Sequence, residues 1–274
     1  MRYRTVGLIL VLLMQGCLST GQRIDRQAQA AGLTRSVIAG TSYQHIVYAN
    51  GSPTSGEWQH RLVVYLDGDG RPWSADGQQP STDPTTRDPI ALRLLAGTAA
   101  PGIYVARPCY QQLLDERCSA ATWTSERYSS ATIASLAAAI RHASANDDAV
   151  QLVLVGYSGG GVLAVLVAEQ LNNVAAVITI AANLDIDAWT RHHGYLPLTE
   201  SLNPATSTHD HLWPEIHLQG GQDAVVPAAT TDGYFLRYPQ AERRTLHDYG
   251  HVCCWVQAWP SLFREVLQSK DGQE

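Results

Sequence analysis

The chain has 274 residues, a formal net charge of −6 and 45% hydrophobic residues. This length suits one large domain, and the hydrophobic content is enough for a packed core, so the sequence excludes an intrinsically disordered chain. The acidic balance and the lack of a long basic run argue against nucleic acid as a partner. We find no internal repeat and no low-complexity block.

The first residues have the pattern of an export signal. Arg2 and Arg4 precede a short apolar run at residues 6–14, which is too short to cross a bilayer comfortably, and a small residue and Cys17 follow. This pattern resembles a bacterial lipoprotein signal. We therefore expect residues 1–16 to be a signal peptide and Cys17 to carry a lipid that anchors the exported protein to the membrane of the bacterial cell envelope, facing the periplasm or the exterior. An ordinary signal peptide with an incidental cysteine is the alternative.

The next segment is rich in Gln, Ala, Ser, Thr and Arg, and we expect residues 17–36 to be a flexible tether. The folded domain is then expected over residues 37–270. Short strands are predicted at residues 37–39 and 44–49. Residues 61–66 are apolar on both sides of the chain, which is typical of a strand covered on both faces of its sheet.

Helical and strand-like segments alternate along the rest of the chain. The predicted helices and strands after residue 66 are, in order, a helix at 89–96 capped by Asp88, a strand at 103–106, a helix at 131–142, strands at 152–155 and 174–181, a strand at 215–218, a helix at 231–238, a strand at 243–246 and a helix at 259–268. This alternation predicts an α/β fold, with a mainly parallel central sheet and helices on both of its faces.

Four cysteines remain after Cys17, and an exported chain meets a compartment in which disulfides form. Cys109 and Cys118 would close a short loop, and this is the favoured bridge. The adjacent Cys253 and Cys254 would form a strained ring if they were joined to each other, and free buried thiols are the alternative. No spacing is typical of a metal site, and we expect neither a metal nor another cofactor.

The sequence Gly156-Tyr157-Ser158-Gly159-Gly160 stands between an apolar run and a helix-prone run. A G-x-S-x-G motif between a strand and a helix is typical of the nucleophile elbow of serine hydrolases. The tight turn exposes the hydroxyl of Ser158, and the N–H of Gly159 is placed to donate to an oxyanion. A glycine-rich turn with an incidental serine is the alternative.

A serine nucleophile needs a base and an orienting carboxylate, and enzymes with this elbow carry them in the order Ser, acid, His. Asp223 follows a short predicted strand, and His251 follows the last predicted strand. Because parallel strands end at the same edge of a sheet, we expect Ser158, Asp223 and His251 to converge there.

Other residues compete for these roles. Asp185 and Asp187 follow the strand after the elbow, where some hydrolases carry the acid. His247 precedes His251 by four residues and is predicted at the end of the strand. His192 and His193 precede Asp223, which breaks the expected order.

These motifs together carry a resemblance. The chain resembles the α/β-hydrolase superfamily over about residues 40–270, and more narrowly it is similar to exported bacterial α/β-hydrolase-like lipoproteins. The superfamily resemblance rests on Leu66-Asp67-Gly68-Asp69-Gly70, Gly156-Tyr157-Ser158-Gly159-Gly160, Gly221-Gln222-Asp223 with Val226-Pro227, and His251, and the narrower one on Arg107-Pro108-Cys109, Trp123-Thr124-Ser125, Asn183-Leu184-Asp185 with Trp189-Thr190, and His251 with Cys253-Cys254-Trp255.

The resemblance implies a second oxyanion donor in the loop after residues 61–66, from the backbone of Asp69 or Gly70. It also implies a short cap after the strand that follows the elbow. The loop reads Asp67-Gly68-Asp69-Gly70 where the family carries His-Gly, so a polar surface loop or a cation-binding loop is the alternative.

The sequence thus predicts a serine hydrolase that cleaves a small-molecule carboxylic ester through an acyl-serine intermediate. Two other classes remain open: a hydrolase-like protein that binds a ligand without turnover, and an acyltransferase acting on an envelope lipid or glycan.

Overall fold

The computed structural model describes residues 18–51, 58–113 and 115–271. The predicted signal peptide and the predicted lipidation site at Cys17 lie outside these residues. A search of the described part of the chain finds no helix with the length and apolar character that crossing a membrane requires.

One eight-stranded sheet forms the centre of the protein, with the strand order β1-β2-β4-β3-β5-β6-β7-β8. The β1–β2 and β2–β4 pairs are antiparallel, and all other neighbouring pairs are parallel. The predicted α/β fold with a mainly parallel sheet is therefore confirmed. The strands are β1 (Thr34–Ala39), β2 (Gln44–Ala49), β3 (Arg61–Leu66), β4 (Gly102–Val105), β5 (Gln151–Tyr157), β6 (Val174–Ile180), β7 (Glu215–Gly220) and β8 (Glu242–Leu246).

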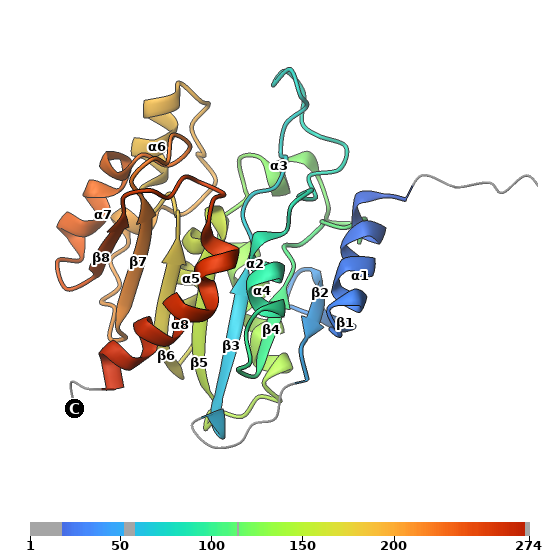
Figure 1. Ribbon diagram of the computed structural model, residues 1–274. Helices are drawn as coiled ribbons and strands as arrows, with labels where there is room; N and C mark the ends of the chain where they lie inside the picture. Colours follow the sequence, from blue (N-terminus) through green and yellow to red (C-terminus); the bar gives the residue numbers. More distant parts are fainter. Residues whose placement is uncertain (1–17, 52–57, 114, 272–274) are drawn as a thin grey trace, which may run out of the picture.

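Helices cover both faces of this sheet (Figure 1). On one face α1, α2 and α8 pack with the sheet into one hydrophobic core, and on the other face α4, α5 and α7 form a second core. The helices are α1 (Thr20–Ala30), α2 (Ile90–Ala96), α3 (Ala120–Trp123), α4 (Ser130–Ala143), α5 (Gly159–Ala168), α6 (Ile186–His193), α7 (Asp232–Arg237) and α8 (Trp255–Asp271), with 3-10 turns η2 (Pro204–Thr206) and η3 (Ala228–Thr231).

The segment expected to be a flexible tether is instead ordered from its early residues. Ser19 caps α1, because its side chain accepts a hydrogen bond from the Gln22 backbone while the Gln22 side chain accepts one from the Ser19 backbone. Ile24 and Ala28, four residues apart, are buried on the same face of this helix. The polar composition of this segment suggested a tether, but the segment forms an amphipathic helix that belongs to the folded domain.

The strand order places the predicted catalytic loops at one point of the sheet. From β3, the chain continues to β4 on one side of it, whereas β5 lies on the other side. In open α/β sheets, ligands bind outside the carboxyl ends of the strands where the order reverses. The loop after β3 and the turn after β5 meet at this point, so Asp69 and Ser158 are brought to one edge.

Two disulfides occur in the described residues. Cys109 and Cys118 are joined, as predicted, and the bridge packs in a small hydrophobic cluster with Tyr43, Tyr110 and Trp123. The adjacent Cys253 and Cys254 are also joined to each other. Cys253 is exposed and Cys254 is half-buried, so the alternative of two free buried thiols does not describe this pair.

A buried ionic cluster lies beside β7, away from the elbow. His211 contacts Glu215 at 2.6 Å and Glu169 at 3.1 Å, and its side chain is 1% exposed. The hydroxyl of Tyr234 also donates to Glu215, at 2.6 Å. Burial lowers the pKa of His211, but the two carboxylates outweigh burial and raise that pKa to about 9. His211 is therefore charged in the folded protein at neutral pH.

This cluster predicts a loss of stability in mild alkali. The folded pKa of His211 lies above its unfolded value, so its contribution is complete below pH 6.5 and is lost as the pH rises to about 9. We expect the free energy of unfolding in urea to fall by about 2–3 kcal/mol over this range. In a His211→Gln variant this slope should flatten, whereas in a variant of the exposed His192 it should persist. An unchanged slope in His211→Gln would contradict the assignment.

Candidate active site

The serine of the elbow stands on a strained turn. Ser158 has φ 53° and ψ −127°, in a region that non-glycine residues rarely adopt. Its backbone N–H donates to the carbonyl of Ile180 at 2.8 Å, which ties the turn to β6. At Gly160 a Cβ atom would lie 2.1 Å from the carbonyl oxygen of Leu66, so only glycine lets α5 pass so close to β3. The buried α5 helix thus begins directly at the serine.

The three residues predicted to converge do so. His251 Nε2 lies 3.1 Å from Ser158 Oγ, and His251 Nδ1 lies 2.8 Å from Asp223 Oδ2. The other carboxylate oxygen of Asp223 accepts hydrogen bonds from the N–H groups of Val225 and Val226, both at 2.8 Å. The Asp223 side chain is fully buried, so its carboxylate is held in one orientation toward the imidazole.

The loop that carries His251 is fixed from two sides. The backbone carbonyl of His251 accepts hydrogen bonds from the hydroxyl of Tyr157, next to the serine, and from Nε1 of Trp255, both at 3.0 Å. The imidazole is therefore positioned by its backbone as well as by Asp223.

The competing residues are engaged elsewhere. Asp185 caps α6 by accepting from the Ala188 N–H at 3.0 Å, and Asn203 bridges it to Asp187. His193 Nε2 contacts the backbone oxygen of Val225 at 2.9 Å, and His192 and His247 are exposed. None of these residues contacts Ser158 within the described chain, so the structure brings Asp223 rather than Asp185 to the histidine.

The loop after β3 lies against the serine. At Gly68 a Cβ atom would lie 3.2 Å from Ser158 Cβ and 3.6 Å from its Oγ. The N–H of Gly68 is occupied, since it donates to the side chain of Asp67 at 3.0 Å. Arg107 Nε donates to the carbonyl oxygens of Asp67 and Gly68, at 3.2 and 3.1 Å. Because a trans peptide directs its N–H opposite to its C=O, the N–H of Asp69 points away from Arg107.

Gly70 is turned toward another part of the chain. It has φ +65°, and a Cβ atom there would lie 2.2 Å from the carbonyl oxygen of Pro84. Its α-carbon thus packs against the segment before α2. Of the two predicted second donors, we therefore favour Asp69, because its N–H points away from Arg107 in the part of the loop that lies beside the serine.

The carboxylate of Asp69 is the centre of a buried ionic cluster. It pairs with Arg107 at 2.7 Å and with Arg127 at 2.8 Å, and their side chains are 4% and 5% exposed. The hydroxyl of Tyr128 donates to the same carboxylate. Burial would raise the pKa of Asp69, but the two guanidiniums hold it below its ordinary value. At Gly159 a Cβ atom would lie 2.0 Å from Asp69 Oδ1, so the cluster touches the start of α5.

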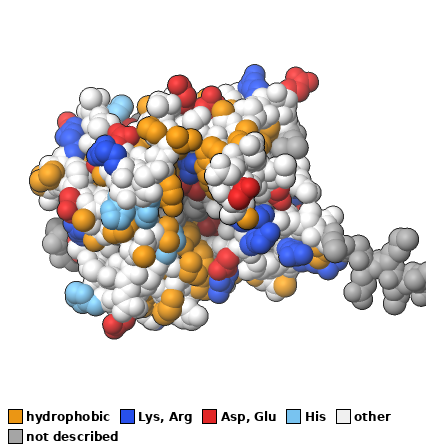
Figure 2. Space-filling model, turned by 90° about the horizontal axis from the view of Figure 1, so that it is seen from above, with side chains coloured by type: hydrophobic (Ala, Val, Ile, Leu, Met, Phe, Trp, Pro, Cys, Tyr) orange, Lys and Arg blue, Asp and Glu red, His pale blue; other side chains and the backbone are white. Residues whose placement is uncertain are grey.

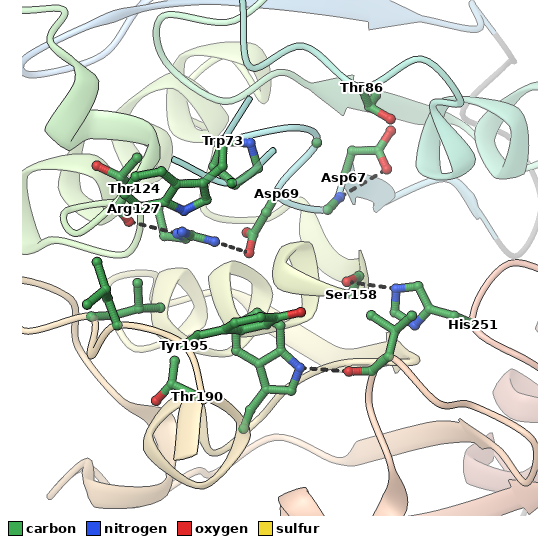
Figure 3. A pocket seen from close by; sticks show the side chains of 18 of the residues that line it. Asp67, Asp69, Trp73, Thr86, Thr124, Arg127, Ser158, Thr190, Tyr195 and His251 are labelled. Carbon is green, nitrogen blue, oxygen red and sulfur yellow. Dashed lines mark hydrogen bonds and ion pairs between the residues drawn. The ribbon is translucent and has the colours of Figure 1, made fainter. Parts of the chain in front are cut away.

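A second buried carboxyl group lies beside the first. Burial raises the pKa of Asp67 to about 7. Its Oδ2 atom has no hydrogen-bond partner in the described part of the chain, and its side chain points toward Thr86 (Figure 3). Its Oδ1 atom accepts the hydrogen bond from the Gly68 N–H.

A cleft of about 880 Å³ opens over Ser158 and His251 (Figure 3). Polar residues of the loop after β3 and of the 124–127 segment line one side. Aromatic and aliphatic side chains line the other, including Trp189, Tyr195, Leu196 and Val252. Trp73 lies over Arg127 on the polar side (Figure 3). Such a mixed, concave surface beside a nucleophile and its base can hold a largely apolar ligand with a reactive carbonyl.

Comparison with known proteins bears on the fold. No family model matches the sequence, and no curated protein matches it. Among solved structures, an esterase of Pyrococcus furiosus is similar with a TM-score of 0.60 and 14% identity, covering 88% of this chain and 91% of that one. An α/β serine hydrolase homologue from Coxiella burnetii has a TM-score of 0.56 and 15% identity, covering 86% and 97%.

A serine hydrolase without a lid from Xanthomonas campestris is also similar, with a TM-score of 0.53 and 13% identity, covering 86% of this chain and 92% of that one. The chain has the α/β-hydrolase fold. The predicted resemblance is thereby supported for the fold alone, because the identities are 13–15%.

Within this α/β-hydrolase fold, the expected cap follows β6. Helix α6 and the irregular segment after it carry Trp189, Tyr195 and Leu196 to the cleft. Trp189 Nε1 donates to the carbonyl of Val225 at 2.7 Å, which fastens the cap to the loop that bears Asp223.

Sequence reasoning missed the residues that hold the loop after β3. Arg107 stands two residues after the end of β4, and Arg127 and Tyr128 stand before α4, so they are distant from Asp69 in sequence. Arg107 belongs to a motif noted in the sequence, but no role was assigned to it. An aspartate between two glycines directly after an apolar strand was the available signal, because a carboxylate that becomes buried there needs a charged or hydrogen-bonding partner.

Proposed function

We propose that the protein is a serine hydrolase that cleaves carboxylic esters through an acyl-serine intermediate. The observation that carries the proposal is the continuous hydrogen-bonded chain from Ser158 Oγ through His251 to Asp223 Oδ2, with distances of 3.1 and 2.8 Å. This arrangement stands on a strained elbow at the floor of a cleft large enough for a substrate. The solved esterases and serine hydrolases that share the fold add support.

The reaction follows from the geometry. Ser158 Oγ attacks the ester carbonyl while its proton passes to His251 Nε2, and the carbonyl oxygen becomes an oxyanion. The imidazolium then gives that proton to the leaving alkoxide, which departs as an alcohol and leaves the acyl-serine. Water repeats the sequence: His251 takes its proton, the acyl–oxygen bond breaks, and Ser158 regains the proton as the acid leaves. Asp223 holds the Nδ1–H tautomer and stabilises the imidazolium.

Two backbone N–H groups are proposed to bind the oxyanion. One is that of Gly159 at the start of α5, where the helix dipole favours negative charge. The other is that of Asp69, because Arg107 binds the carbonyl of the same peptide. The Asp69 carboxylate beside this site would oppose an oxyanion if it stood alone. Together with the guanidiniums of Arg107 and Arg127, the carboxylate forms a cluster with a net charge of +1. This positive charge stabilises an oxyanion.

The proposed location rests on the first residues of the sequence, which have the pattern of a lipoprotein signal ending at Cys17. We propose that the enzyme is exported and held by this lipid at a membrane of the bacterial cell envelope, and that it acts on esters there.

A fluorophosphonate probe tests the proposed activity. The probe should label the protein at a stoichiometry of about one, because the triad activates only one hydroxyl. Peptide mass spectrometry should place the label on Ser158, and a short p-nitrophenyl ester should be hydrolysed by unlabelled protein only. A probe that leaves the folded protein unlabelled would favour a ligand-binding protein. Added alcohols that capture the acyl group in preference to water would favour an acyltransferase.

A further inference from the structure

Exposed apolar side chains gather at the mouth of the cleft. The large hydrophobic side chains that are exposed in the described residues number eight, and four of them line the cleft. These four are Tyr195 (55% exposed), Leu196 (72%), Val225 (46%) and Val252 (53%), and together they are named the apolar rim. Figure 2 shows hydrophobic side chains along the hollow that is seen from this side. Half of the large, exposed hydrophobic side chains in the described residues thus lie at the mouth of the cleft.

The apolar rim is held in place by specific contacts. The carbonyl of Val225 is bound by Trp189 Nε1 at 2.7 Å and by His193 at 2.9 Å. The ring of Tyr195 packs against that of Trp189, with centroids 5.3 Å apart. Val252 follows His251, whose carbonyl is fixed by two hydrogen bonds. A fixed, exposed apolar surface costs free energy in water unless something covers it, which marks it as a contact surface.

The charged side chains near the cleft are paired within the chain. Asp69 pairs with two buried arginines beneath the serine loop, and Asp88 pairs with Arg93 at 2.8 Å. The rim itself has no charged side chain. The whole chain carries a net charge of −6, so an anionic surface would repel it. An uncharged, apolar layer is the partner that this surface fits.

The described chain begins at the edge of the sheet where the cleft opens. At Gly21, in the first turn of α1, a Cβ atom would lie 2.9 Å from the carbonyl oxygen of Gln111. Gln111 follows the carboxyl end of β4, so the start of α1 lies at the carboxyl edge, near the level of α3 and α6 in Figure 1. Cys17 precedes the described residues by one position. A lipid on Cys17 would therefore bring this edge of the protein to the membrane.

We propose that the apolar rim rests on the lipid layer that the Cys17 anchor reaches, and that the substrates are lipid esters entering the cleft from that layer. This inference rests on the proposed hydrolase activity and names its substrate class. The acyl chain of such an ester would pass along Leu196 and Tyr195 to place its carbonyl at Ser158. The anchor and the rim would then act together, one holding the enzyme at the surface and the other orienting it.

The test separates the rim from the anchor. The chain from residue 18 to 274, which lacks both the apolar run at residues 6–14 and the attachment point for lipid, is mixed with phosphatidylcholine vesicles, and the bound fraction is measured by flotation. We expect binding that weakens about tenfold with Leu196→Ser, since a leucine would no longer enter lipid. The matched controls are Leu212→Ser and Leu236→Ser, whose side chains are 92% and 83% exposed but do not line the cleft. They should bind within about twofold of the parent.

The inference is overturned if the parent chain does not bind vesicles, or if the control variants lose as much binding as Leu196→Ser. It is also overturned if sedimentation shows that the parent chain is a dimer and that Leu196→Ser is a monomer, because the rim would then join two copies of the chain. The hydrolase proposal is judged separately by hydrolysis of a monomeric p-nitrophenyl ester. If vesicles bind through the rim but this ester is not cleaved, the activity fails while the membrane contact stands. If the ester is cleaved but vesicles are not bound, only the lipid-ester inference fails.

Discussion

Replacing Asp223 by asparagine should lower kcat/KM for a short p-nitrophenyl ester about ten-thousand-fold with the fold intact. The amide oxygen can keep the two hydrogen bonds from Val225 and Val226 that now reach Asp223 Oδ1. The amide nitrogen would then face His251 Nδ1 in place of Oδ2 and donate to it. Nδ1 would lose its proton, and Nε2 would carry one and could not accept the proton of Ser158.

The matched control is Asp185→Asn. Asp185 caps α6 through a 3.0 Å hydrogen bond and does not contact His251. An asparagine can also cap a helix, so kcat/KM should stay within about threefold of the wild type. Thermal unfolding of both variants checks that the comparison is between folded proteins. A large loss in Asp185→Asn together with a small loss in Asp223→Asn would identify Asp185 as the acid and refute the proposed triad.

Replacing Arg107 should remove much of the oxyanion stabilisation. Its Nε atom holds the carbonyl of the Gly68–Asp69 peptide at 3.1 Å, and its Nη2 atom pairs with Asp69 at 2.7 Å. Arg107→Lys keeps the charge but cannot bind both groups with one planar side chain. We expect kcat to fall by about 10²- to 10³-fold, the usual effect of losing one oxyanion donor, with KM changed little.

A structural role alone would not produce the same pattern. A boronic acid that forms a tetrahedral adduct on Ser158 should lose affinity in parallel with kcat, whereas a product carboxylic acid should bind as before. Arg93→Lys is the control, because Arg93 also pairs with an aspartate, at 2.8 Å, but among the described residues it forms no ion pair or hydrogen bond with the part of the loop after β3 that carries Asp69. If Arg107→Lys lowers only the melting temperature and leaves the boronic acid affinity unchanged, Arg107 does not position the donor.

The triad was accessible from sequence because topology fixes it. A serine after one strand, an aspartate after another and a histidine after the last must approach one another when parallel strands end at one edge. The spacing of Gly156, Ser158 and Gly160 identified the strand that matters. Neither step required knowledge of side-chain packing.

The support around the triad was not accessible in the same way. Asp69 meets Arg107 and Arg127 across 38 and 58 positions of sequence, through tertiary contacts that no periodicity encodes. The prediction for the segment that forms helix α1 was wrong for a different reason. Its composition is polar, and the informative features were a capping box at Ser19 and two apolar residues four positions apart, which composition averages away.

Gly159 and Asp69 occupy complementary volumes, since a single methyl group on the glycine would meet the carboxylate at 2.0 Å. The same methyl group would also meet the Tyr128 hydroxyl, so a larger residue after the nucleophile requires smaller side chains at both positions 69 and 128. Losing the carboxylate would also leave Arg107 and Arg127 without their shared counter-ion. These five positions form an epistatic unit. Among descendants of this chain they should be inherited or replaced together, even while the surrounding surface diverges.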